Sequence, residues 1–137
     1  MKGKIIGYWV TTALTALLFA FGGVTDILRS PQVLEGLSHL GYAPYFALVI
    51  GVWKVLAVPA ILVPKFPRLK EWAYAGLVFD LTGASASHFF SGDPPGKWIT
   101  PLVLIGLVAG SWALRPASRK LADNPPAAPK ATEAPSA

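Results

Sequence analysis

The stretch Tyr45–Val63, YFALVIGVWKVLAVPAILV, decides the fold class of this chain because Lys54 is its one charged residue. An α-helix crosses the hydrocarbon core of a bilayer with roughly 20 apolar residues, which is close to the length of this stretch. Three further stretches of the same kind lie at 5–25, 72–90 and 98–114. We therefore predict an all-α membrane protein whose four transmembrane helices form an antiparallel bundle over residues 1–115.

The composition of the chain agrees with a bilayer as its main solvent. Apolar residues make up 53% of the 137 residues and charged residues 14%, with a mean hydropathy of +0.51, which is too apolar for an ordinary soluble domain. The absence of cysteine excludes disulfide scaffolds, thiol redox centres and thiolate-bound metals. The sequence also carries no metal, haem or flavin signature. We predict no catalytic residues and no independent catalytic activity.

The distribution of basic residues predicts the orientation in the membrane. Short segments rich in Lys and Arg stay on the cytoplasmic side. The only basic residues in the loops after the first and third spans are Arg29 and Lys97. We therefore predict that both termini face the cytoplasm, and that the net charge of +5 reflects this topology instead of a nucleic-acid partner. The basic residues on the cytoplasmic side would be Lys2, Lys4, Lys65, Arg68, Lys70, Arg115, Arg119, Lys120 and Lys130.

The first apolar stretch has a second interpretation as a cleaved signal peptide. Residues 1–4 form a basic segment, and residues 20–22 follow a small-x-small pattern. The apolar run is longer than that of a typical signal peptide, and its removal would leave an odd number of spans with the two ends on opposite sides. We keep a transmembrane helix as the prediction.

The first loop is predicted to contain a short amphipathic helix. Ser30 and Pro31 are typical of an N-cap followed by the first helical position, and Gly41 is typical of a helix end. This helix would lie on the outer surface or cover the mouth of the bundle. Beyond residue 115 the chain has no apolar period, so we predict a disordered cytoplasmic tail over residues 116–137. The apolar face of the short helix would consist of Val33, Leu34, Leu37 and Leu40.

Two charged residues fall near the middle of predicted spans. Lys54 lies in the second span and Asp80 in the third, and a rise of 1.5 Å per residue puts them at nearly the same level. A charge at the bilayer centre costs at least ~2.5 to 3.5 kcal/mol, so each of these residues needs a partner or a function. We predict a Lys54–Asp80 ion pair, which acts either as a ligand-binding or proton-handling site or as a clamp that fixes helix register.

A second polar cluster is predicted nearer the outer surface, where Asp26 ends the first span and His88 ends the third. A hydrogen bond between these two side chains would raise the pKa of the imidazole and create a proton relay toward the outside. The simpler interpretation is an aspartate that caps a helix end and a histidine at the edge of the membrane.

Glycines beside the charged positions are predicted to allow close helix packing. Gly51 shares a helix face with Lys54, and Gly76 and Gly83 share one with Asp80. A Gly-x-x-x-Gly motif in the fourth span would face another helix of the bundle or another protomer. The residues of this motif are Gly106 and Gly110.

Two segments carry a resemblance to a known family. They are GVWKVLAVP at 51–59 and PKFPRLKEWAYAGLVFDLTGASASH at 64–88. Over roughly residues 5–115 the chain resembles the DoxX-like family. The resemblance implies a small four-helix protein of the bacterial inner membrane, with Lys54, Asp80 and His88 as the matching polar positions. The wider DoxX group takes its name from a membrane subunit associated with thiosulfate:quinone oxidoreductase.

Two hypotheses for the function remain open at this point. The first, implied by the resemblance, is a non-catalytic or quinone-associated subunit of a membrane redox complex, in which electron transfer needs a partner subunit or a bound quinone. The second is a small solute or ion transporter that acts as a homo-oligomer. The subunit hypothesis predicts an apolar slot that opens to lipid beside the charges, and the transporter hypothesis predicts a water-lined path through the bundle.

Overall fold

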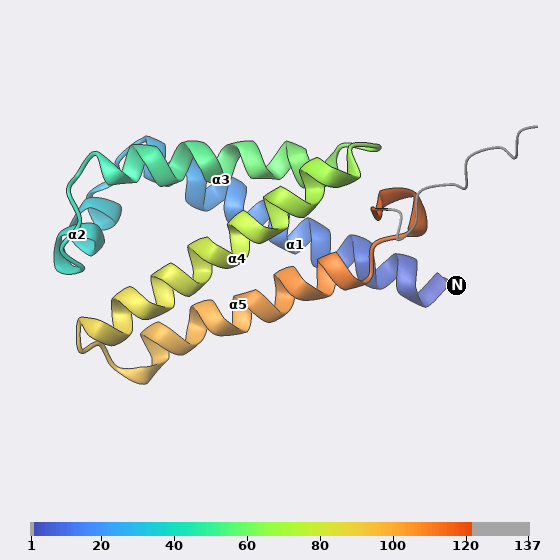
Figure 1. Cartoon of the computed structure of the whole chain (residues 1–137). Coiled ribbons are helices and arrows are strands. Elements are labelled where there is room, and N and C mark those ends of the chain that lie inside the picture. Colours follow the sequence, from blue (N-terminus) through green and yellow to red (C-terminus); the bar gives the residue numbers. More distant parts are fainter. Residues whose placement is uncertain (1, 122–137) are drawn as a thin grey trace, which may run out of the picture.

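The fold consists of helices joined by short connections, as seen in a computed structural model that describes residues 2–121 (Figure 1). No strand occurs among these residues, so the predicted all-α class is confirmed. The elements are α1 (Lys2–Ile27), α2 (Pro31–His39), α3 (Phe46–Leu62), α4 (Pro67–Phe90), α5 (Pro95–Ala113) and the 3-10 turn η1 (Ala117–Arg119).

The long helices differ in how well they meet the requirements of a membrane span. By length and composition, α1 and α5 are long and apolar enough to cross a bilayer. Helix α3 is also apolar but has 17 residues, which corresponds to about 26 Å at 1.5 Å per residue. Helix α4 has 24 residues and carries four charged side chains in its first turns and centre, which lower its hydropathy. These four are Arg68, Lys70, Glu71 and Asp80.

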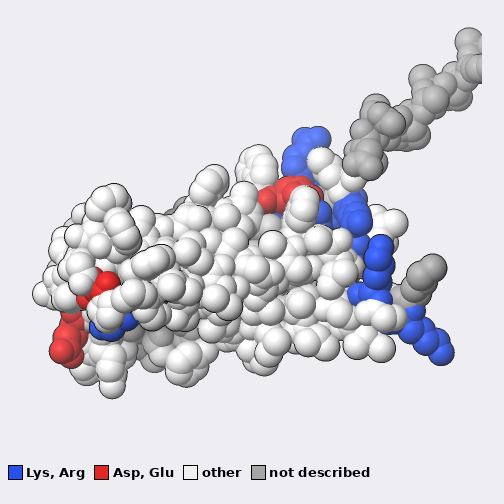
Figure 2. Space-filling view, turned by 90° about the horizontal axis from the view of Figure 1, so that it is seen from below, with Lys and Arg blue, Asp and Glu red and all other residues white. Residues whose placement is uncertain are grey.

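The chain order brings two groups of connections to opposite ends of the molecule. Helix α1 packs against α3 and α5, and α4 packs against α5 and α3. The start of α1, the α3–α4 turn and η1 lie at one end, which we call the basic end, whereas α2 and the α4–α5 loop lie at the other, which we call the α2 end (Figure 1). On the face shown in Figure 2, the middle of the molecule is almost free of charged side chains, and Lys and Arg gather mainly at the basic end.

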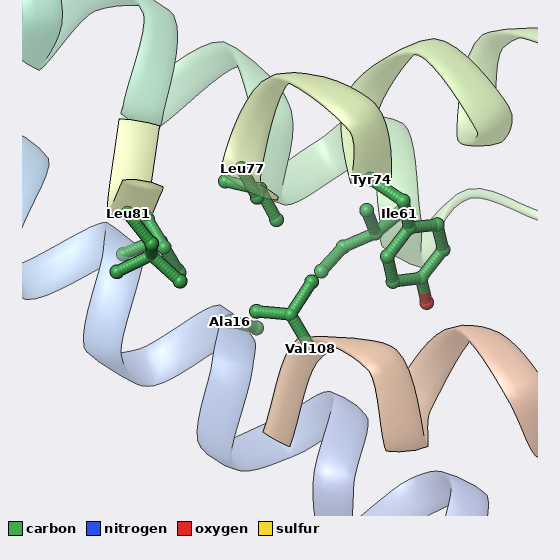
Figure 3. Packing of buried hydrophobic residues seen from close by; sticks show 7 residues of the cluster. Ala16, Ile61, Tyr74, Leu77, Leu81 and Val108 are labelled. Carbon is green, nitrogen blue, oxygen red and sulfur yellow. The ribbon is translucent and has the colours of Figure 1, made fainter. Parts of the chain in front are cut away.

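The interior is a small apolar cluster to which α1, α3, α4 and α5 all contribute (Figure 3). Many large apolar side chains point outward instead, and Phe21 of α1 and Phe79 of α4 are 75% and 73% exposed. Such extensive apolar surface is typical of contact with lipid. Together with the apolar helices, it indicates a membrane protein. The buried members of the cluster are Ala16, Phe19, Ile61, Tyr74, Leu77, Leu81 and Val108.

The predicted helix in the first loop is present as α2. Pro31 is its first residue, and Gly41 follows its end with a φ of +86°, a left-handed conformation that favours glycine. Ser30 precedes the helix without a capping hydrogen bond from its side chain. The predicted apolar face turns inward, and Leu37 is buried against the rest of the fold.

Helices α1 and α3 meet at a contact between two glycines. A Cβ atom added to Gly51 would lie 2.9 Å from the carbonyl oxygen of Gly23, and one added to Gly23 would lie 3.0 Å from the carbonyl oxygen of Gly51. The absence of side chains therefore lets the two backbones touch. Gly51, which was selected from the sequence, thus lies at the α1–α3 contact together with Gly23, which was not selected.

Three of the other predicted packing glycines do not have this role within the described chain. A Cβ atom at Gly76, Gly83 or Gly106 would meet no atom within 4 Å, so these predictions were wrong for contacts between the described helices. The reason is that α4 packs through a different face, which includes Leu77 and Ser85, and that α5 packs through the face of Val108 and Ser111. Gly110 makes an ordinary contact, because its Cβ atom would lie 3.6 Å from a methyl group of Thr11.

The segment after α5 is ordered over its first residues. Arg119 in η1 donates a hydrogen bond to the carbonyl oxygen of Leu62 (2.9 Å) and another to the hydroxyl of Tyr8 (3.3 Å). Its guanidinium also lies over the rings of Tyr8 and Trp9. The predicted disorder from residue 116 was therefore wrong for η1, because these contacts fix it, and residues 122–137 of the predicted tail lie outside the described residues.

Candidate functional site

Three charged side chains from three helices form the charged triad of the interior. Nζ of Lys54 in α3 lies 2.9 Å from Oδ2 of Asp26 in α1, and 3.9 Å from Oδ2 of Asp80 in α4. Only the first distance is that of a hydrogen bond. The structure thus brings Lys54 within ion-pairing range of Asp80, as the sequence suggested, but Asp26 is the closer partner.

The glycine contact between α1 and α3 explains why Asp26 reaches Lys54. Asp26 follows Gly23 by three residues, and Lys54 follows Gly51 by the same spacing, so each charged residue shares a helix face with the glycine at the contact. A Cβ atom at Gly51 would lie 2.8 Å from the Cβ atom of Asp26. The repeated Gly-x-x-charge spacing was the signal in the sequence that could have predicted this pair.

A groove runs along the outside of α3 and α4, and we call it the α3–α4 groove. Its cavity has a volume of about 390 Å³. Among the residues that the structure describes, Lys54 and Asp80 are its only ionisable lining residues, and they mark its polar end. Trp53 and Trp72 border it and are 69% and 73% exposed, so the groove opens on the surface of the bundle. The remaining lining residues are Ile50, Leu56, Ala57, Ala60, Leu69, Ala73, Gly76 and Leu77.

The polar end and the apolar part of this groove occupy different levels along the helices. Lys54 is in the middle of α3 and Asp80 in the second half of α4, whereas Leu69 and Trp72 lie in the first turns of α4, near the basic end. A molecule in the groove would therefore place its polar group against the charged triad and its apolar part along α3 and α4.

Both histidines meet at Asp93 at the α2 end, and we call this arrangement the histidine clasp. His39 Nε2 lies 2.7 Å from Oδ1 of Asp93, and His88 Nδ1 lies 2.7 Å from Oδ2. Hydrogen bonds from His88 and His39 lower the pKa of the Asp93 carboxyl. The clasp connects α2 to α4 and to the α4–α5 loop.

The predicted hydrogen bond between Asp26 and His88 was therefore wrong, because each of these side chains bonds a different partner. His88 turns toward Asp93, and Asp26 turns toward Lys54. Sequence reasoning missed Asp93 because it lies in a loop, where helical spacing gives no information about facing. Its position next to Gly92, whose φ is +76°, depends on the turn that follows α4.

Two cationic side chains cap the C-terminus of α3, which lies at the basic end. The Lys70 ammonium, which is fully buried, donates hydrogen bonds to the carbonyl oxygens of Ala60 (3.1 Å) and Val63. Together with Arg119 on the carbonyl of Leu62, it satisfies acceptors that a helix end leaves free. Burial lowers the pKa of Lys70, and the nearby positive charges of Arg119 and Arg115 act in the same direction. The sequence interpretation had treated Lys70 only as an orientation signal.

A second ion pair stands beside these cations. Nη2 of Arg115 lies 2.7 Å from Oε1 of Glu71, and the indole of Trp112 donates a hydrogen bond to Oε2 (2.9 Å). Burial raises the pKa of Glu71, but the hydrogen bonds from Trp112 and Arg115 and the charge of Arg115 outweigh burial and lower it overall. This pair joins the start of α4 to the end of α5.

The sequence model of the DoxX-like family matches residues 10–111. The chain belongs to the DoxX-like family. The match extends from α1 to α5 and includes all three residues of the charged triad. No curated protein and no solved structure matches the chain. Family membership and the apolar helices together indicate that this DoxX-like protein associates with a lipid bilayer.

The core of the DoxX-like bundle also contains a buried hydroxyl network. Ser111 of α5 lies 2.6 Å from the Thr12 hydroxyl of α1 and 2.8 Å from the Tyr74 hydroxyl of α4. All three residues are buried. Because each hydroxyl finds a partner on another helix, the network fixes how α1, α4 and α5 fit together.

Within residues 2–121, no group of three or more His, Asp or Glu side chains is arranged to hold a metal ion. The groups that the described site presents are the Lys54 ammonium, the carboxyl groups of Asp26 and Asp80, and the apolar side chains that line the groove.

Proposed function

We propose that this DoxX-like protein is a multi-pass protein of the bacterial inner membrane that binds a quinone in the α3–α4 groove, as a subunit of a membrane redox complex. The observation that carries the proposal is the position of Lys54 and Asp80 at the polar end of an otherwise apolar groove. The protein would have no catalytic activity of its own, and electron transfer would need a partner subunit.

The proposed topology has α1, α3, α4 and α5 crossing the bilayer with both termini in the cytoplasm. Support comes from the exposed apolar side chains on the long helices and from the concentration of Lys and Arg at the basic end (Figure 2). Basic loops are retained on the cytoplasmic side. In this orientation Lys54 and Asp80 lie near the middle of α3 and α4, Asp26 reaches them from the last turn of α1, and the groove extends from Lys54 and Asp80 toward the cytoplasmic leaflet.

The dimensions and chemistry of the groove fit a quinone. Its volume of about 390 Å³ lies within the range of roughly 300 to 1,000 Å³ found for small-molecule sites. The Lys54 ammonium can donate a hydrogen bond to a quinone carbonyl, and the indole faces of Trp53 and Trp72 offer a surface for an aromatic ring or an isoprenoid chain. When bound, the quinone would supply the capacity to carry electrons.

A phospholipid fits the same groove less well. Its headgroup would sit at the membrane surface near the basic residues of the α3–α4 turn, such as Lys65. Its acyl chain would then press against Lys54 and Asp80, which leaves charged groups in contact with hydrocarbon. A ligand that fits this groove therefore needs a polar group at the level of Lys54 and Asp80.

The transporter hypothesis has less support in the described residues. The groove lies on the outer side of α3 and α4, while the space among α1, α3, α4 and α5 is filled by the apolar cluster around Ile61 and Val108. A path through the bundle would have to pass through this cluster.

The quinone proposal can be tested with a matched pair of glycine variants in α4. Gly76 lines the groove and Gly83 does not, and a Cβ atom at either position would meet no described atom within 4 Å. We expect Gly76→Leu to fill the groove and weaken binding of decylubiquinone to the protein in lipid nanodiscs by at least about tenfold, while Gly83→Leu binds like the wild type. Quenching of tryptophan fluorescence provides the binding signal.

Two outcomes would contradict the proposal. One is a wild-type protein that does not bind decylubiquinone, and the other is equal binding by the Gly76→Leu and Gly83→Leu variants. Mass spectrometry of the protein extracted with its native lipid adds an independent measurement: we expect an endogenous quinone with the wild type and Gly83→Leu, and its loss from Gly76→Leu. Retention of phospholipid alone would assign the groove to lipid.

A further inference from the structure

The charged triad contains one positive charge and two acidic groups. The charged groups that act on Asp80 are Lys54 from α3 and Asp26 from α1. If both carboxyl groups were ionised, the triad would carry a net charge of −1. A net charge inside a membrane-spanning bundle is unfavourable, because neither lipid nor packed apolar side chains solvate it.

The geometry distinguishes the two acidic groups. The Lys54 ammonium donates a hydrogen bond to Asp26 at 2.9 Å, and the Asp26 side chain is only 9% exposed. Asp80 is 3.9 Å from the same ammonium, beyond a hydrogen-bond length. Lys54 therefore forms its ion pair with Asp26.

Asp80 also differs from Asp26 in what it faces. Asp80 lines the α3–α4 groove, whereas Asp26 does not, and the Asp80 side chain is 27% exposed. It is therefore the acidic group of the triad that can touch a bound molecule. A neutral carboxyl group in this position has an O–H that can donate a hydrogen bond into the groove.

We propose that Asp80 is a neutral carboxylic acid in the resting protein and donates its O–H to a carbonyl oxygen of the molecule in the groove. The ligand class is then an uncharged apolar molecule with a hydrogen-bond acceptor at its polar end. The identity of the ligand rests on the proposed quinone function, but the proton on Asp80 follows from the triad alone. Lys54 and Asp26 remain an ion pair whether the groove is filled or empty.

Infrared spectroscopy of the ligand-free protein in nanodiscs tests the proton directly. At neutral pH, we expect the wild type minus Asp80→Asn difference spectrum to contain the C=O band of a protonated carboxyl group, shifted by exchange into D2O. Asp26→Asn should also remove this band, because the Lys54 charge then becomes available to Asp80 and ionises it. Both variants must first elute as folded protein from a sizing column.

Two results of this measurement would overturn the proposal. The first is a wild-type protein without the band, which means that Asp80 is ionised. The second is a band that persists at full strength in Asp26→Asn, which means that the proton does not depend on the balance of charges in the triad. If Asp26→Asn fails to fold, Lys54→Met serves in its place, and a second protonated carboxyl band is then expected, because both acids lose their counter-charge.

Binding of decylubiquinone tests the hydrogen bond itself. Asp80→Asn keeps a donor in a side chain of the same shape, and Asp80→Leu keeps the volume without a donor. We expect Asp80→Asn to bind within about threefold of the wild type and Asp80→Leu about tenfold more weakly. Equal binding by Asp80→Leu and Asp80→Asn would overturn the assigned hydrogen bond.

The two proposals fail in distinguishable ways. If the wild type does not bind decylubiquinone but shows the carboxyl band, the quinone function is overturned and the proton on Asp80 stands. If it binds decylubiquinone without the band, the quinone function stands and the neutral acid is overturned.

Discussion

Gly51 of α3 lies so close to Asp26 of α1 that a Cβ atom at position 51 would sit 2.8 Å from the Cβ atom of Asp26. The contact sets the separation of the two helices and brings Asp26 within hydrogen-bonding distance of Lys54. The smallest side chain in the region therefore determines the geometry of its most polar group.

Replacement of Gly51 by alanine should separate α1 from α3. The added methyl group would overlap Asp26 and the Gly23 carbonyl, and overpacking of this kind costs about 1 to 3 kcal/mol. We expect a lower thermal unfolding midpoint in detergent for Gly51→Ala. Gly106→Ala is the matched control, since its methyl group meets no described atom within 4 Å. Equal midpoints for the two variants would show that the glycine contact has no role in stability.

Loss of the Ser111 hydroxyl should destabilise the bundle. Ser111→Ala leaves the buried hydroxyls of Thr12 and Tyr74 without their shared partner, and an unsatisfied buried polar group costs about 1 to 3 kcal/mol. Chemical unfolding in mixed micelles can measure this difference. Thr82→Ala serves as the control because Thr82 is exposed on α4 and its hydroxyl bonds only within its own helix. A variant as stable as this control would contradict the prediction.

The histidine clasp predicts a dependence of stability on acid pH. Because the folded protein lowers the pKa of Asp93 below its ordinary value of 3.8, the ionised carboxylate stabilises the fold above that pH, and this stabilisation is lost as the pH falls through the lower folded value. We expect the wild type to unfold at a higher temperature than Asp93→Asn at pH values above 3.8, with a difference that shrinks on further acidification.

The control for this experiment is Glu35→Gln, which removes an exposed carboxylate from α2. If Glu35→Gln reproduces the pH profile of Asp93→Asn, the effect arises from general surface charge and not from the clasp.

Neutralisation of Glu71 should weaken the junction between α4 and α5. Arg115 has a side chain that is 4% exposed and relies on Glu71 as its charged partner. Glu71→Gln would leave the guanidinium without a counter-charge, and hydrogen bonds to charged groups contribute about 1.5 to 3 kcal/mol. We expect lower resistance to thermal unfolding, together with a change in Trp112 fluorescence, because the single amide oxygen of glutamine replaces the two carboxylate oxygens that accept from the Trp112 indole and from Arg115. Unchanged stability and emission would exclude this role.

Local sequence patterns predicted the helices because they depend on composition and turn chemistry. The apolar stretches marked α1, α3, α4 and α5, and Pro31 with Gly41 marked α2. The partner of Lys54 does not follow from apolar periodicity, because it depends on how α1 and α3 cross. Spacing along α3 gives the face that Lys54 occupies, but only the glycine contact shows which helix meets that face at this level.

The same distinction explains the errors at Gly76 and His88. A glycine on the face of Asp80 is compatible either with close helix packing or with an open surface. Gly76 lies on an open surface, because α4 packs against its neighbours through Leu77. His88 was assigned to Asp26 because both end predicted spans, but the loop after α4 turns Asp93 back toward it. Residues in loops acquire their neighbours from turn geometry, which apolar periodicity does not describe.

The contacts of Arg119 have a consequence for the biosynthesis of this protein. Arg119 emerges from the ribosome after all five α-helices, yet it binds the hydroxyl of Tyr8 in α1 and a carbonyl at the end of α3. These contacts cannot form while α5 is still being translated. The basic end therefore reaches its final form only when synthesis has passed η1, and a nascent chain halted earlier lacks the contacts by which Arg119 joins α1 to the end of α3.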